Sequence, residues 1–123
     1  TRHTVQNLGL RLEAGSPTKV FCYSGDGMFT PTASKLYTNA DLLVHEAYTN
    51  DGTVKNPRGE TITIGTKTHC SLQQLERLDD MARPKKMALI HLNRKLREDK
   101  KDILKKYRQR RWIMPDAGEV IEL

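Results

Sequence analysis

Hydrophobic residues along the chain form two kinds of pattern, and the first is a short uninterrupted block. Leu42-Leu43-Val44 and Met87-Ala88-Leu89-Ile90 are blocks of this kind, which are typical of strands covered on both faces. Gly15, Ser16 and Pro17 supply a turn between two further apolar segments. Strands are therefore predicted over residues 4–13, 19–23, 41–46, 86–91, 112–114 and 119–123.

The second pattern is an apolar residue at every third or fourth position, which predicts helices. Residues 71–82 show it best, because Thr68 or Ser71 can cap their start and Pro84 follows their end. Helices are predicted over residues 32–37, 71–82 and 97–109. The polar stretch 49–67 predicts a long loop that contains a strand at 61–64. Because strands alternate with helices, the fold class expected is α/β with a mixed sheet.

Length and composition limit the class of protein. A chain of 123 residues forms at most one ordinary domain, and 37% hydrophobic with 29% charged residues fits a globular protein. No apolar run approaches the ~18 residues of a membrane span. Cys22 and Cys70 have no metal-like spacing, so a reduced, cytoplasmic setting is expected, although one disulfide stays open. Thr1 in place of methionine indicates a processed chain or a piece of a longer one.

The positive charge of the chain is concentrated in one segment. Residues 94–111 contain ten basic and three acidic residues, so this segment carries +7 and the rest of the chain −1. The simpler interpretation is a solvated helix face rich in lysine. The alternative is a surface for a phosphate-bearing substrate or a nucleic acid.

Titratable residues stand where predicted strands end or begin, or where a predicted helix starts. These residues are His3, Asp26, His45, Glu46, His69 and His91. Open α/β sheets place ligand sites at strand ends, and histidine with aspartate suits zinc, manganese or iron. Each residue alone is more often a structural histidine or a turn aspartate, as Asp26 between Gly25 and Gly27 would be. Their joint order along the chain is the informative feature.

That order resembles the second half of a metallo-β-lactamase-fold hydrolase, and most of all the ribonuclease Z branch. The segments that carry the resemblance are residues 3–11, 23–27, 40–47, 69–71 and 89–92. The resemblance implies half of an αββα sandwich, a mixed β-sheet with flanking helices, as a single partial domain over residues 1–123. Two departures are Gly27 and Cys70, each of which stands where the family has a threonine or a serine.

The resemblance also implies a metal centre. It gives His3, Asp26 and His91 as ligands, with Asp26 bridging two divalent ions, expected to be zinc, with manganese or iron as alternatives. The family's His-x-His-x-Asp-His signature belongs to the first half of the fold and is absent from this chain. A site with three ligands split between two ions should bind metal poorly, so the isolated chain is expected to have weak or no activity.

The resemblance further implies roles in proton transfer and substrate binding. Glu46 would orient His69, and His69 would donate a proton to the leaving group, whereas His45 corresponds to a position that is not a ligand. Arg94 and Lys95 are expected to contact a substrate phosphate.

Three functional hypotheses follow from these observations. The first is one part of a metal-dependent hydrolase, with a phosphodiester or RNA substrate expected first and other esters or lactams left open. Its partner would be a missing amino-terminal half or a second copy of the chain. The second is a self-associating half-domain, a homo-oligomer that acts as a binding or structural module. The third is a basic nucleic-acid-binding protein.

Overall fold

The computed structural model describes residues 8–27, 29–64 and 69–123. Its elements are β1 (Leu10–Ala14), β2 (Lys19–Tyr23), α1 (Pro31–Leu36), β3 (Leu42–Glu46), β4 (Thr53–Lys55), β5 (Thr61–Thr63), α2 (Leu72–Ala82), β6 (Met87–Ile90), α3 (Arg94–Glu98), α4 (Lys100–Lys106), the 3₁₀ helix η1 (Arg108–Arg110) and β7 (Trp112–Ile113). None of the helices described is long and apolar enough to cross a membrane.

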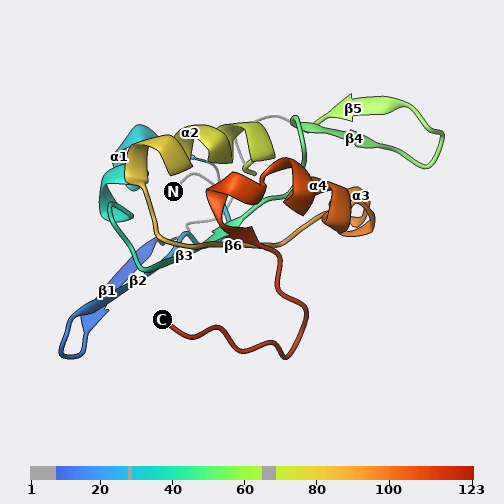
Figure 1. Cartoon of the computed structure of the whole chain (residues 1–123). Helices are drawn as coiled ribbons and strands as arrows, with labels where there is room; N and C mark the ends of the chain where they lie inside the picture. The colour runs from blue at the N-terminus through green and yellow to red at the C-terminus, as the bar shows by residue number, and fades with distance from the viewer. Residues whose placement is uncertain (1–7, 28, 65–68) are drawn as a thin grey trace.

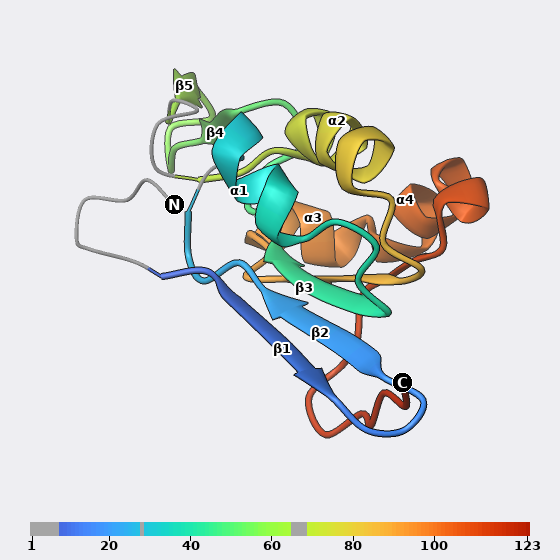
Figure 2. The same cartoon turned by 90° about the vertical axis from the view of Figure 1, so that its left-hand side faces the viewer.

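Five of the strands form one mixed sheet in the order β1-β2-β3-β6-β7. Strands β1 and β2 are antiparallel, whereas the pairs β2–β3, β3–β6 and β6–β7 are parallel. The four α-helices lie on one side of this sheet, and the segment after β7 descends on the other side (Figures 1 and 2). The predicted α/β class with a mixed sheet and flanking helices is confirmed.

The core lies between the sheet and the helices. Cys22, Leu43, Met87 and Trp112 are register partners across four neighbouring strands, and all four are buried in the core cluster. Helix α2 packs its leucines against them, and Leu72, Leu75 and Leu78 have no exposed surface. Their recurrence every third position explains why this stretch folds as an amphipathic helix on the sheet.

The opposite face of the sheet is apolar as well. Because side chains alternate along a strand, the partners Leu10, Tyr23 and Val44 face away from the helices, as do Leu12 and Phe21. Leu10, Leu12 and Tyr23 are 43%, 51% and 36% exposed. These five residues form what we call the open face. The apolar side chains on both faces of β2 are typical of a strand in a sheet that is packed on two sides.

The amino-terminal ends of the central strands are tied together by one carboxylate. Asp41, directly before β3, accepts a hydrogen bond from the backbone N–H of Val20 at 2.7 Å and one from Lys85 Nζ at 2.9 Å. The Asp41 N–H donates to the carbonyl of Val20 at 2.8 Å. These contacts fix where β2, β3 and β6 begin, and therefore where their carboxyl ends meet.

Two helix and strand predictions near the carboxyl terminus are wrong. The helix expected over residues 97–109 is divided into α3, α4 and η1, with a break at Asp99, whose ψ of 11° is not helical. Aspartate has low helix propensity because its side chain competes for nearby backbone groups. Residues 119–123 form no strand, since Val120 is 87% exposed and no neighbouring strand pairs with it in the described structure.

The loop predicted over residues 49–67 contains more structure than expected. The expected strand at 61–64 is present as β5, but it pairs with β4, which the sequence analysis did not predict. The two strands form a hairpin that projects from the body of the molecule (Figure 1). The three residues of β4 are too few for an apolar periodicity to be recognised.

Replacement of Asp41 by asparagine (Asp41→Asn) should lower the free energy of unfolding at neutral pH. The hydrogen bond from Lys85 is the main reason why the pKa of Asp41 lies below its ordinary value of 3.8. The ionised carboxylate therefore stabilises the fold above that value, and its contribution is lost as the pH falls through the lowered pKa. Urea unfolding across this range should show a wild-type advantage that shrinks in acid. An advantage independent of pH would contradict this role.

Candidate metal centre

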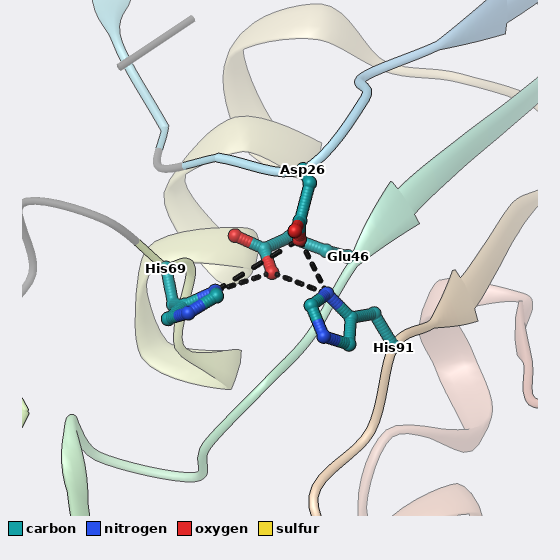
Figure 3. A group of neighbouring side chains, drawn as sticks. All are labelled: Asp26, Glu46, His69 and His91. Atoms are coloured by element: carbon teal, nitrogen blue, oxygen red, sulfur yellow. Dashed lines mark hydrogen bonds and ion pairs between the residues drawn. The ribbon is translucent and has the colours of Figure 1, made fainter. Parts of the chain in front are cut away.

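Four side chains that are far apart in the sequence meet at one end of the sheet. Asp26, Glu46, His69 and His91 each offer a donor atom, and these atoms all lie within 4.8 Å of one another. Asp26 follows β2, Glu46 ends β3, His91 follows β6, and His69 stands shortly before α2 (Figure 3). Parallel neighbours end at the same edge of a sheet, so the topology itself brings three of the four together.

Asp26 is presented by a constrained turn at the end of β2. Gly25 has a φ of 66°, in the left-handed region that glycine adopts without a steric penalty. The buried Ser24 hydroxyl donates to the Gly25 carbonyl at 2.7 Å and accepts from the Glu46 N–H at 3.3 Å. Ser24 thus links the turn that carries Asp26 to the end of the neighbouring strand.

Glu46 lies at the centre of the cluster and is fully buried. Its Oε1 accepts a hydrogen bond from the backbone N–H of Cys70 at 3.0 Å, and its Oε2 lies 2.9 Å from His69 Nδ1. The same Oε2 lies 3.3 Å from His91 Nδ1. Burial, followed by the neighbouring Asp26 carboxylate, raises the pKa of Glu46 to about 8.

Asp26 is shifted in the opposite direction to Glu46. Burial opposes its ionisation, but hydrogen bonds with Glu46 and His91 hold the pKa of Asp26 below its ordinary value. Two adjacent carboxyl groups with one pKa raised and one lowered behave as a pair that shares a single proton. A cation can replace that proton, so the electrostatics of the cluster fit a metal site.

His91 adopts a backbone conformation that is uncommon for residues other than glycine. Its φ is 55°, in the left-handed region, directly after β6. In this turn its Nδ1 contacts Asp26 Oδ1 as well as Glu46. Non-glycine residues in this region cost of order 1–3 kcal/mol, and they concentrate at functional sites.

His69 is held from a second direction by an aromatic residue. The ring of Tyr48 stacks on that of His69, with centroids 4.4 Å apart and planes at 29°, and lies 5.4 Å from the ring of His91. The Tyr48 N–H donates to the Cys70 carbonyl at 2.9 Å, and its own carbonyl accepts from the Asn93 N–H at 3.2 Å. The backbone of Tyr48 therefore joins the segments that carry the two histidines.

Tyr48 was missed by the sequence analysis. A tyrosine two residues after a carboxylate is not a specific signal, and its contact with His69 depends on the return of the chain after the hairpin. The proximity of Tyr48 to Glu46 at a strand end was the available clue.

His45, Arg94 and Lys95, also named from the sequence, lie elsewhere. His3 falls outside the described residues. His45 is buried on the helix side, donates from Nδ1 to the Glu46 carbonyl at 2.9 Å, and has a pKa lowered to about 4 by burial, so it is neutral. Arg94 and Lys95 are exposed and form ion pairs along their own helix, at 3.0 and 3.3 Å, with the acidic residues four positions ahead.

Comparison with known proteins identifies the fold. No family model matches the chain, and neither does any curated protein. The metallo-β-lactamase fold protein YhfI from Bacillus subtilis is a similar solved structure, with a TM-score of 0.59 and 20% identity over 84% of this chain. This chain has part of the metallo-β-lactamase fold. The similarity covers 40% of the YhfI chain.

A second solved structure is also similar to this chain. The short form of human tRNase Z matches with a TM-score of 0.52 and 23% identity, over 72% of this chain and 32% of that chain. The described chain thus spans well under half the length of either structure. The fold expected from the sequence, part of a metallo-β-lactamase fold, is confirmed at the level of architecture, and the ribonuclease Z branch stays a prediction.

The stacking of Tyr48 on His69 can be measured as a coupling energy. A double-mutant cycle of Tyr48→Ala and His69→Ala should give a coupling of about 1 kcal/mol, because stacked ring pairs contribute about that much beyond burial. Tyr48→Phe retains the ring and should retain most of the stability. Equal losses for Tyr48→Phe and Tyr48→Ala, or a coupling near zero, would show that the stacked ring does not hold His69.

Proposed function

We propose that this protein is a metal-dependent hydrolase of phosphodiesters, with RNA as the leading substrate, and that this chain carries one part of its active site. The observation that supports the proposal is the convergence of two carboxylates and two imidazoles within 4.8 Å. The similarity to a structure named as a tRNase adds to it. Lactam, thioester or other ester hydrolysis would use the same metal core on this fold, so the substrate class is the least constrained part of the proposal.

Asp26 and His91 are the residues of this chain best suited to hold metal. Both are partly exposed and present an oxygen and a nitrogen donor, a combination that suits zinc, manganese or iron. We propose two divalent ions, with zinc first. When bound, they would polarise the phosphoryl group and supply a water nucleophile at neutral pH.

Glu46 and His69 are suited to proton transfer rather than to holding metal. Both Glu46 oxygens are already engaged, one with the Cys70 N–H and the other with His69 Nδ1. The contact at Nδ1 orients the imidazole so that His69 would deliver a proton from Nε2 to the leaving oxygen. Tyr48, stacked on the ring, limits its rotation.

The metal assignment predicts which substitutions weaken zinc binding. Asp26→Asn and His91→Asn should each weaken it at least tenfold by calorimetry, whereas Asp51→Asn, at an exposed aspartate, should not. Asparagine tolerates the left-handed backbone at position 91, so His91→Asn tests the ligand without adding backbone strain. Zinc binding unchanged in both Asp26→Asn and His91→Asn would refute the assignment.

We further propose that the open face packs against a second sheet that brings the remaining ligands. The apolar open face is one reason, and the other is that the described chain covers only 40% and 32% of its two structural neighbours. A missing amino-terminal half is the first candidate for this partner, and a second copy of the chain is the alternative.

Association through the open face can be tested by light scattering. Leu12→Lys should weaken self-association, or binding of the amino-terminal half, at least tenfold, because a lysine would be desolvated there. Met81→Lys, at an apolar residue 53% exposed on α2, is the matched control.

The chain with excess zinc but no partner should turn over a phosphodiester substrate weakly or not at all. Robust turnover by a chain shown to be monomeric would contradict the half-site role.

A further inference from the structure

A row of basic side chains runs along the segment that follows the candidate metal centre. Its members are Arg94, Arg97, Lys101, Lys105 and Arg108, and we call them the basic stripe. They are spaced by three, four, four and three positions, which places side chains on one side of a helix. The residues on the other side, among them Leu96, Ile103 and Tyr107, are buried.

The break at Asp99 does not disturb this alignment. The Asp99 N–H donates to the Lys95 carbonyl at 3.0 Å, and the Ile103 N–H donates to the Asp99 carbonyl at 3.0 Å. These are i to i−4 bonds, so α3 and α4 follow each other directly with a local bend at Asp99. At a rise of about 1.5 Å per residue, the stripe extends along ~20 Å of chain.

Most of the charge on the stripe is not neutralised within the protein. In the part of the chain that the structure describes, only Arg94 of the stripe has a carboxylate within 4.0 Å, that of Glu98. This exposed pair is weak enough to exchange for another anion. Lys100 and Arg110, outside the stripe, are by contrast held by aspartates. All five stripe residues are exposed.

The surroundings of the stripe indicate what kind of anion it fits. A membrane-binding helix would present large apolar side chains beside its cations, but Leu96 and Ile103 are buried in the core. A platform for single-stranded bases would present aromatic rings, but Tyr107 and Trp112 are 6% and 5% exposed and stack on each other at 4.4 Å. An extended row of cations alone matches a regular array of phosphates.

We propose that the basic stripe binds the phosphate backbone of a double-stranded region of nucleic acid. DNA and RNA duplexes share this chemistry. The stripe begins three residues after His91, so a bound duplex would lie beside the candidate metal centre. This proposal deepens the proposed function. Duplex binding itself does not depend on the proposed function, but the link between duplex binding and cleavage does.

The test is a salt titration in which fluorescence anisotropy measures the binding of labelled duplexes. Labelled RNA and DNA duplexes and a single-stranded oligonucleotide are compared in the presence of a chelator. The stripe variant, a triple substitution, should weaken duplex binding at least tenfold. It combines Arg97→Gln, Lys101→Gln and Lys105→Gln. The slope of log affinity against log salt should fall by about 0.9 for each DNA phosphate that the variant no longer neutralises.

A matched control separates the stripe from net charge. The control variant also loses three exposed cations, but from other elements of the structure. It combines Lys35→Gln, Arg58→Gln and Arg77→Gln. The proposal is supported if duplex binding persists with the chelator and in His91→Asn, and if the control variant retains it while the stripe variant loses it. This outcome would support the proposal even if the metal assignment fails. Equal weakening in both variants, a preference for the single strand, or binding only to anionic lipid vesicles would overturn it.

Discussion

The candidate site depends on the buried carboxylate of Glu46. A carboxyl group without exposed surface is costly unless each oxygen has a partner, and here one oxygen accepts from the Cys70 N–H and the other contacts two histidines. These contacts connect the end of β3 to the start of α2 and to the turn after β6. Burial, together with the neighbouring Asp26 carboxylate, raises the pKa of Glu46, so a proton or a cation is favoured beside these two carboxyl groups.

The fold gives this carboxylate its surroundings through strand order. Strands β2, β3 and β6 are parallel neighbours, so the residues that follow them meet at one edge whatever their separation in sequence. Asp41 fixes the opposite ends of the same strands. The strained φ of His91 and the glycine turn before Asp26 are local adjustments that direct the two side chains inward once the strands have placed them.

Much of this arrangement could be predicted from the sequence because strong local signals carried it. The apolar blocks around Leu43 and Leu89 indicated buried strands, and the charged or imidazole residue after each block indicated the functional edge. The pairing of Glu46 with His69 could not be derived from periodicity and came from the family resemblance. The structure places them in contact, whereas their catalytic roles stay predictions. Tyr48 and the β4–β5 hairpin escaped prediction because their contacts depend on tertiary placement.

The exposed apolar sheet face and the small number of metal ligands have one physical explanation. A sheet with helices on one side leaves Leu10, Leu12 and Tyr23 partly exposed on the other. The proposed two-metal site, with Asp26 and His91 as its ligands among the described residues, would be short of donors in the same way. Both deficits are removed by one additional sheet, since its inner side would cover the leucines while its strand ends reach the cluster. Packing and coordination therefore lead to the same proposed partner, independently of each other.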